Sequence, residues 1–214
     1  MTPLVAVLAV AGAVLGVAAD RFAVRWPEHD EEHPAGRAVD WRTAATGLFG
    51  AFAFAVLGGR FRPEDTLAFL LFGLWFATLV VGFAIDLDQR LLPDELTLPV
   101  VPIALVFDLV GANPLVGHEV LPAVAVAVVV PAALFLLSIP FGAGAFGLGD
   151  VKLLLGVGLM AGSLGATTGL LAGLLTAGLV LAVLLGARRI GRRTYIPFGP
   201  FLIFGAVWGI FVTT

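Results

Sequence analysis

Long apolar runs separated by short charged segments dominate this 214-residue chain. A helix that crosses a bilayer needs about 20 mostly apolar residues, and continuous apolar runs favour helices over the alternating strands of a membrane barrel. We therefore expect about eight membrane-spanning helices, in an all-α polytopic membrane bundle. The sixth expected helix is short, and only Gly162 and Ser163 separate it from the seventh. The expected spans are about 3–19, 43–58, 66–85, 96–112, 119–140, 151–162, 164–187 and 196–213.

Composition supports the membrane assignment. Hydrophobic residues make up 60% of the chain and charged residues 13%, against about 45–50% and about 25% in soluble domains. A soluble enzyme is excluded, because so few polar residues cannot cover so much apolar surface. The net charge of −3 gives no indication of a nucleic-acid partner. Because the chain has no cysteine, a disulfide framework, a zinc–cysteine site and a cysteine nucleophile are also excluded.

The basic residues indicate how the chain is oriented, because cytoplasmic loops carry an excess of Lys and Arg. Only Arg60 and Arg62 fall on one side of the eight-span arrangement, and the other ten basic residues fall on the opposite side. We therefore expect a multi-pass protein of the inner (plasma) membrane with both termini external. Residues 1–214 would form a single integral-membrane domain, with residues 20–42 as a short cytoplasmic loop. The first span is expected to be retained, because no Lys or Arg precedes it.

Glycines recur at intervals of four residues in several of the expected spans. This spacing puts bare backbone on one helical face and allows helices to approach closely in lipid. We expect close helix packing there, without a chemical role. The repeats are Gly12/Gly16, Gly158/Gly162, Gly165/Gly169/Gly173 and Gly205/Gly209.

Two acidic segments, residues 85–95 and 147–152, are expected at the same cytoplasmic face. Two carboxylates in a partly dry site titrate together, so that one can take a proton from water while the other polarises a peptide carbonyl. This aspartic-protease chemistry needs no metal. Asp150 is the stronger candidate, because it is the only acid between Glu119 and the C-terminus. It is expected near the first turn of its helix, where the helix dipole favours the charged form. Asp108, near the external end of the fourth span, is expected to make a buried polar contact.

The residues around Asp150 suggest further roles. Gly147 and Gly149 would allow a substrate backbone to approach where any side chain would clash. Lys152 has two open interpretations, either a group that tunes the acids or holds a lipid phosphate, or a lysine that snorkels to the membrane surface. Asp88, Asp94 and Glu95 are each more typical of a solvated loop in which carboxylates balance nearby arginines.

Three motifs, taken in order, resemble those of the type IV prepilin peptidases, and the resemblance covers about residues 83–214. Asp86 and Asp94, in a Leu-Leu-Pro-Asp context, resemble the first aspartate motif of that family. Residues 147–153, Gly-Leu-Gly-Asp-Val-Lys-Leu, are similar to its second motif, the GxGD box. Residues 195–201, Tyr-Ile-Pro-Phe-Gly-Pro-Phe, resemble the segment that opens its last helix.

The resemblance implies a membrane aspartic endopeptidase. Its catalytic dyad would be Asp86 and Asp150, with Asp88 as the alternative for the first acid. The family removes short basic leader peptides from pilin-like precursors at the cytoplasmic membrane edge. Those precursors and the lipid bilayer are therefore the expected partners, residues 83–214 the catalytic part, and no cofactor is expected. The sequence indicates no oligomeric state.

The N-terminal part departs from the family. Many bacterial members carry two CxxC pairs in a long first cytoplasmic loop, which hold zinc, and also methylate the new N-terminus. Here that loop is only about 20–42 and has no cysteine, which puts the methyltransferase activity in doubt. Two other classes of protein remain open from the residues alone. A proton-coupled transporter would use the same acids as a proton relay. A catalytically silent assembly scaffold would need neither Asp86 nor Asp150.

Two short patterns carry little weight. Residues 142–147 match the dinucleotide pattern GxGxxG, but they follow an apolar span rather than a strand of a βαβ unit. Residues 29–33 match the zinc-protease pattern HxxEH, but Pro27 and Pro34 leave little room for the helix that this pattern requires. We expect neither a nucleotide nor a metal ion at these places.

Overall fold

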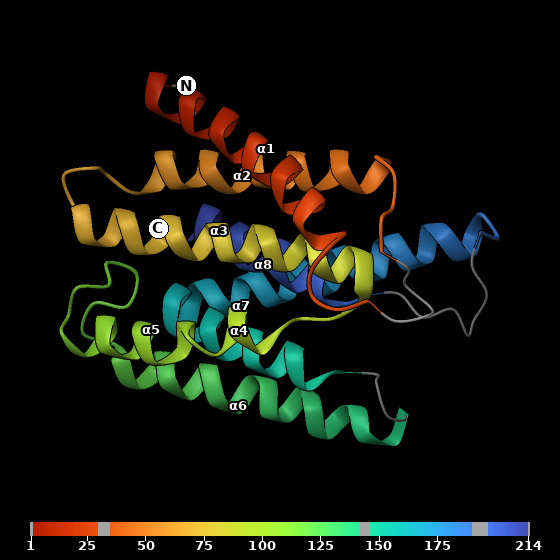
Figure 1. Cartoon of the computed structure of the whole chain (residues 1–214). Helices are drawn as coiled ribbons and strands as arrows, with labels where there is room; N and C mark the ends of the chain where they lie inside the picture. The colour runs from red at the N-terminus through yellow and green to blue at the C-terminus, as the bar shows by residue number, and fades with distance from the viewer. Residues whose placement is uncertain (1, 30–34, 142–145, 190–196, 214) are drawn as a thin grey trace.

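The computed structural model describes residues 2–29, 35–141, 146–189 and 197–213, and these residues form helices and no strands (Figure 1). The prediction of an all-α fold is confirmed for this part of the chain. The helices are α1 (Pro3–Ala23), α2 (Trp41–Arg60), α3 (Thr66–Gln89), α4 (Asp94–Thr97), α5 (Val100–Leu109), α6 (Val120–Ser138), the short 3₁₀ helix η1 (Ile139–Phe141), α7 (Leu148–Gly186) and α8 (Gly199–Val212).

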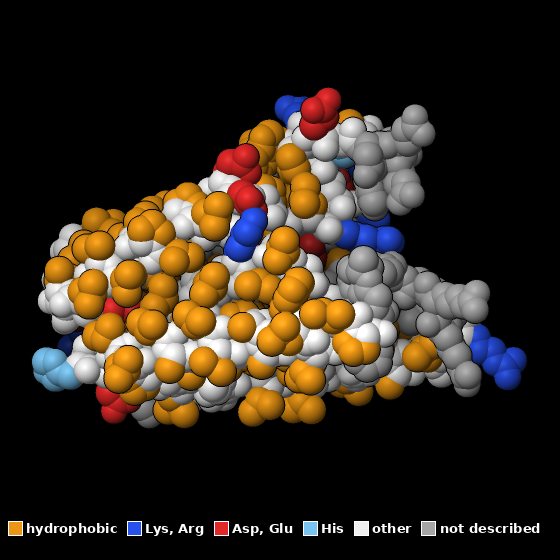
Figure 2. Space-filling view, turned by 90° about the horizontal axis from the view of Figure 1, so that it is seen from below, with side chains coloured by type: hydrophobic (Ala, Val, Ile, Leu, Met, Phe, Trp, Pro, Cys, Tyr) orange, Lys and Arg blue, Asp and Glu red, His pale blue; other side chains and the backbone are white. Residues whose placement is uncertain are grey.

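Five of these helices, α1, α2, α3, α6 and α7, are long and apolar enough to cross a membrane. Their outward surfaces are also apolar. Leu121 and Leu137 of α6, for example, are 79% and 68% exposed, which would be costly in water but suits contact with lipid. Figure 2 shows one face of the molecule covered largely by hydrophobic side chains, with few charged ones. The count of eight spans stays a prediction, because α8 is shorter and the expected fourth span is divided between α4 and α5.

The long helix α7 is two helical segments joined at a sharp bend. Gly162 has φ 69° and ψ 177°, a conformation open to glycine but strained for other residues. Beyond the bend, a Cβ added at Gly165 would lie 3.4 Å from Thr213 at the end of α8, and one at Gly173 would lie 2.6 Å from Phe201 at its start. The second segment therefore runs antiparallel to α8. The bend lies where the sequence predicts the boundary between the sixth and seventh spans.

Glycine-mediated packing is confirmed in three helix pairs. A Cβ added at Gly158 of α7 would lie 2.4 Å from Ala127 Cα on α6. A Cβ added at Gly12 of α1 would lie 2.1 Å from the carbonyl oxygen of Gly50 on α2. One added at Gly169 of α7 would lie 2.4 Å from the carbonyl oxygen of Gly205 on α8. Because no side chain fits at these separations, the glycines set how closely the backbones pack.

Asp108 makes the buried polar contact expected of it, next to the bend in α7. It is 1% exposed, and Asn113 Nδ2 donates to its Oδ1 at 2.8 Å. The same nitrogen lies 3.3 Å from the carbonyl oxygen of Leu159 and 3.2 Å from that of Met160. Carbonyls that precede a break in a helix lose their intrahelical donors, and Asn113 supplies a replacement.

Asp86 and Asp150 lie at one end of the bundle, which we call the site end. There α1 and α3 finish, and α2, α7 and α8 begin (Figure 1). Tight packing of Phe72, Phe76 and Ile85, all fully buried, holds α3 in the middle of the bundle. At the opposite end, Arg60 donates from Nε to the carbonyl oxygen of Ile210 at 2.9 Å and thereby joins α2 to α8.

Candidate active site

Asp86 lies in the last turn of α3 and is only 5% exposed. Its Oδ2 is buried and has no hydrogen-bond partner among the described residues. A Cβ added at Gly199, the first residue of α8, would lie 2.7 Å from this oxygen. The absence of a side chain at Gly199 therefore creates the space that the carboxyl group occupies. A buried oxygen without a partner is costly and calls for an explanation. Asp108 Oδ2 is in the same condition, so what distinguishes Asp86 is the second acid near it.

Asp150 lies in the first turn of α7, as the sequence predicts. Its Oδ2 accepts a hydrogen bond of 3.1 Å from the backbone N–H of Gly147, the residue that caps the helix. This contact fixes the carboxyl group at the helix N-terminus, where the positive end of the helix dipole lies.

The structure brings Asp86 and Asp150 together, although 64 positions separate them in the sequence. The Asp150 carboxylate is close enough to Asp86 to act on it electrostatically, and so is the guanidinium group of Arg90. Arg90 ends α3 in the left-handed conformation, at φ 57°, and its N–H donates to the carbonyl oxygen of Asp86 at 3.0 Å. The geometry therefore gives two neighbouring acids, one of them buried, at one end of the bundle. Their catalytic role stays a prediction.

Asp88, the alternative for the first acid, has very different surroundings. Its Oδ1 accepts from Arg37 Nε at 2.8 Å and from Arg42 Nη1 at 2.9 Å, and its Oδ2 lies 3.5 Å from His29 Nε2. These two guanidinium groups and His29 surround the Asp88 carboxylate and form strong, charge-assisted contacts with it. The contacts thus favour Asp86 over Asp88 as the reactive acid.

The other residues expected near the site are also placed. Lys152 Nζ donates to Asp94 Oδ1 at 2.6 Å, so that an ion pair links the two aspartate motifs. A Cβ added at Gly149 would lie 3.1 Å from Leu92 Cβ, which shows that this glycine allows α7 to pack on the first motif. A Cβ added at Gly147 would meet only ordinary contacts, at 3.6 Å or more. Approach of a substrate backbone stays a prediction, with more room at Gly147.

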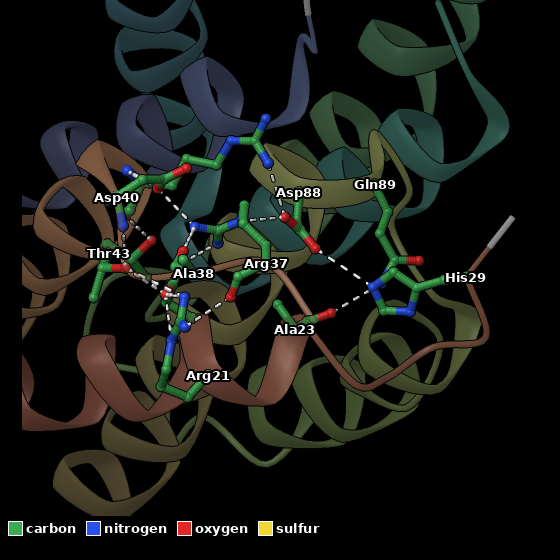
Figure 3. Close-up of polar contacts among 12 residues, drawn as sticks. Arg21, Ala23, His29, Arg37, Ala38, Asp40, Thr43, Asp88 and Gln89 are labelled. Carbon is green, nitrogen blue, oxygen red and sulfur yellow. Dashed lines mark hydrogen bonds and ion pairs between the residues drawn. The ribbon is translucent and has the colours of Figure 1, made fainter. Parts of the chain in front are cut away.

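A cluster of charged side chains beside Asp86 is not predicted from the sequence. It consists of three acids and three arginines from the end of α1, the following loop, the start of α2 and the end of α3 (Figure 3). The sequence contains one signal that could have indicated this cluster, the acid Asp20 directly after an apolar run. Asp20 is fully buried. We call this set the arginine cluster, and its members are Asp20, Arg21, Arg37, Asp40, Arg42 and Asp88.

An apolar groove of about 680 Å³ lies between α2, α3, α8 and the second segment of α7. Arg42, Asp88 and Arg90 are the charged residues that line it, and all three are at the site end. The groove therefore runs along the helices and reaches the neighbourhood of Asp86. Its apolar lining includes Phe49, Phe52, Phe83, Leu87, Phe201 and Phe204.

No group of three or more His, Asp or Glu side chains that could hold a metal ion occurs within the described residues. His29, the first residue of the HxxEH pattern, contacts Asp88 and Gln89. The remainder of that pattern, residues 30–33, lies outside the described residues, as do residues 142–145 of the GxGxxG pattern and residues 195–196 of the third family motif.

Comparison with known proteins identifies the family. Residues 71–187 match the model of the type IV leader peptidase family, and the chain belongs to this family. Three relatives are named prepilin leader peptidase/N-methyltransferase. The Aeromonas salmonicida protein is 34% identical over 181 residues, 82% of this chain and 61% of the relative. The Aeromonas hydrophila protein is 34% identical over 152 residues, which are 69% of this chain and 51% of the relative. The Dickeya chrysanthemi protein is 31% identical over 182 residues, which are 83% of this chain and 62% of the relative.

The chain thus spans between about half and three fifths of the length of these relatives. No solved structure matches it. The matched segment contains both Asp86 and Asp150, and the family resemblance inferred from the motifs is confirmed. The relatives are named as peptidases, and none of these names supports the transporter alternative.

Proposed function

We propose that this protein is a membrane aspartic endopeptidase that removes the basic leader peptide from type IV prepilin-like precursors. Asp86 and Asp150 would activate the water that cleaves the peptide bond. The observation that carries the proposal is the buried, unpartnered oxygen of Asp86 within electrostatic reach of Asp150. Membership of the type IV leader peptidase family supports the substrate class.

The chemistry requires one carboxylate and one carboxylic acid. The ionised group takes a proton from water as the water oxygen attacks the carbonyl carbon of the scissile bond, and the protonated group donates to the carbonyl oxygen. When the tetrahedral intermediate collapses, the C–N bond breaks and the leaving amine takes up the proton that the first carboxyl group removed from water. The hydroxyl proton of the intermediate returns to the second carboxyl group, which restores the starting state. Because two neighbouring carboxyl groups resist double ionisation, the pair favours the singly protonated state that this mechanism needs.

The apolar groove is the proposed place for the hydrophobic segment that follows the cleavage site in the substrate. Such a segment must stay in the bilayer, and a groove lined by aromatic and aliphatic side chains from Phe52 to Phe204 suits it. Because Asp88 and Arg90 at the end of α3 line one end of the groove, a helix seated there would bring its first peptide bonds to the same end of the bundle as the acids. The basic leader would then lie outside the groove, at the site end.

We propose that the site end faces the cytoplasm, as the distribution of basic residues indicates. The chain has no native cysteine, so single-cysteine variants provide a direct test. Arg25→Cys at the site end and Glu64→Cys at the opposite end both replace exposed residues. An impermeant maleimide should label Glu64→Cys in intact cells, and Arg25→Cys only after permeabilisation. The reverse pattern would overturn the orientation.

A cleavage assay tests the activity. A prepilin-like precursor would be co-reconstituted with the wild-type protein, with Asp86→Asn and with Asp150→Asn, and the product would be identified by mass. Each Asn variant should lower the rate by about 100-fold or more, because proton transfer to or from the reacting groups is lost. Wild-type rates in either variant would remove that residue from the mechanism. Absence of cleavage by the wild-type protein would refute the function itself. Our proposal covers the peptidase activity alone.

A further inference from the structure

The arginine cluster is electrically balanced and joins three helices at the site end. Asp20, Asp40 and Asp88 contribute three negative charges, and Arg21, Arg37 and Arg42 contribute three positive ones. Asp20 is fully buried and Asp88 is 7% exposed. Buried carboxylates are tolerated only when they are paired and hydrogen-bonded. The cluster therefore satisfies groups that would otherwise destabilise this end of the bundle.

Arg37 is the centre of the cluster. Each of its three nitrogen atoms donates to a carboxylate from a different part of the chain (Figure 3). Nη2 donates to Asp20 on α1 at 2.5 Å, Nη1 to Asp40 at the start of α2 at 2.6 Å, and Nε to Asp88 on α3 at 2.8 Å. Only a guanidinium group presents donors in a fixed planar fork that can span three separate acceptors.

Arg37 also stays protonated. Burial by itself would lower the pKa of Arg37, but hydrogen bonds and charge interactions with Asp88 and Asp20 outweigh burial and raise the pKa above its usual value. The guanidinium group therefore keeps the positive charge on its side of the link.

The link to Asp88 bears on Asp86, because the two acids are two residues apart on α3. Successive residues of an α-helix are rotated by about 100°, so the two side chains lie about 200° apart and point to opposite faces. Asp88 faces the loop that holds Arg37, and Asp86 faces Gly199 of α8. Gln89 adds a second tie on the loop side, since its Nε2 donates to the carbonyl oxygen of Ala23 at 3.0 Å. The last turn of α3 is thus held between the loop and α8.

We propose that Arg37 is a positioning residue for Asp86, which it holds through Asp88 and the last turn of α3. The inference rests on the proposed function, because it assigns Asp86 a role in the reaction. Arg37 makes no contact with Asp86 in the hydrogen bonds and ion pairs of the described residues, and its effect is transmitted by the helix backbone. Loss of the link would let Asp86 move relative to Asp150.

Arg37→Lys is the main test, because it keeps the charge but cannot bridge three carboxylates. We expect kcat for precursor cleavage to fall by about 10- to 100-fold, since small misplacements of a catalytic group have effects of this size. KM should stay within about twofold, because ground-state binding is untouched. Wild-type kcat, or a change in KM alone, would overturn the inference. Arg25→Ala, an exposed arginine at the start of the same loop, is the matched control and should leave both values unchanged.

A second comparison separates positioning from general support of the fold. Asp88→Ala removes the link to α3, whereas Asp40→Ser removes only the link to α2 and keeps a good helix N-cap. We expect a loss of kcat in Asp88→Ala like that in Arg37→Lys, and a kcat within about twofold of wild type in Asp40→Ser. Equal losses in the two variants would show that the cluster merely stabilises the fold. Should Arg37→Lys fail to accumulate in the membrane, this pair decides the question.

A measurement without substrate keeps the inference separate from the proposed function. Leu91, just beyond α3, is 46% exposed, and a spin label at Leu91→Cys would report the mobility of this end of the helix. Arg37→Lys should increase that mobility, and Asp40→Ser should not. Unchanged mobility in Arg37→Lys would overturn the inference even if the protein is active. If the wild-type protein cleaves no precursor while the mobility changes, the proposed function fails but the mechanical link stands.

Discussion

Asp86 and Asp88 are two residues apart on one helix, yet their surroundings are opposite in character. Asp88 is enclosed by Arg37, Arg42 and His29. Asp86 faces a glycine and has an oxygen without a partner among the described residues. A fully paired carboxylate is a structural anion, whereas an incompletely paired one beside a second acid is available for proton transfer. The comparison shows how one helix turn can carry a fully paired acid on one face and an incompletely paired acid on the other.

The largest effect should come from the glycine that makes room for Asp86. In Gly199→Ala, the new Cβ would lie 2.7 Å from Asp86 Oδ2 and 2.8 Å from its Cγ, which forces the carboxyl group away. We expect cleavage of a prepilin-like precursor to fall by about 100-fold, measured as kcat in reconstituted membranes. Gly178→Ala is the control, because nothing lies within 4 Å of the added atom, and it should retain full activity. A fully active Gly199→Ala would show that the position of Asp86 is unimportant.

A smaller effect should follow from Gly149→Ala, which acts on Asp150. The added Cβ would lie 3.1 Å from Leu92 Cβ, so the start of α7 must shift by a few tenths of an ångström. We expect kcat to fall by about tenfold. Gly147→Ala has space for its Cβ, and a change confined to KM there would indicate that the substrate backbone approaches this residue. Identical kinetics in Gly149→Ala and the wild-type protein would contradict the proposed geometry.

Asp88→Asn tests the structural side of the comparison. Asparagine keeps an acceptor oxygen for Arg37 but loses the charge, so the link to the loop weakens without breaking. We expect activity to fall by only about two- to threefold, in contrast to the loss of about 100-fold in Asp86→Asn. The same cleavage assay, applied to both variants, measures these two losses of activity. Inactivation by Asp88→Asn with full activity in Asp86→Asn would exchange the roles of the two acids.

The smallest effect should come from Lys152→Met. The ion pair between Lys152 and Asp94 is partly exposed, and such pairs contribute about 0–1 kcal/mol to stability. We expect the thermal midpoint of the detergent-solubilised protein to change little and cleavage to stay within about twofold of wild type. A loss of tenfold or more would show that Lys152 acts on the acids or the substrate rather than on the packing of the two motifs.

Much of the fold follows from the sequence, because the apolar runs are long and their glycine spacing is regular. The helical class, the packing at Gly12 and Gly169, and the division near Gly162 are predicted in this way. The fourth span is less simple than predicted, since the backbone turns at Leu98 and Pro99 and separates α4 from α5. Leu98 and Pro99 keep helical dihedral angles, and the break arises because Pro99 has no N–H to donate to the carbonyl oxygen of Glu95.

The site is only partly predictable. Motifs with a family resemblance point to Asp86 and Asp150, and span counting puts both at one end of the bundle. The arginine cluster is missed, because Asp20, Arg37 and Asp88 belong to three separate segments whose polar residues resemble an ordinary solvated loop. The apolar groove is missed as well, since residues from α2, α3, α7 and α8, which are far apart in the sequence, line it together.

The sequence by itself determines that this is a helical membrane protein, because its apolar runs are long. The order of its charged segments places the two aspartate motifs at the same end. Tertiary structure alone decides which acid is surrounded by arginines and which is incompletely paired. Asp86 and Asp88 are chemically identical and almost adjacent, so their difference comes only from what packs on each face of α3. Gly199 makes room for the Asp86 carboxyl group, which keeps one oxygen without a partner among the described residues, whereas Arg37 and Arg42 donate hydrogen bonds to Asp88. Burial makes a carboxylate depend on the donors that the fold brings to it.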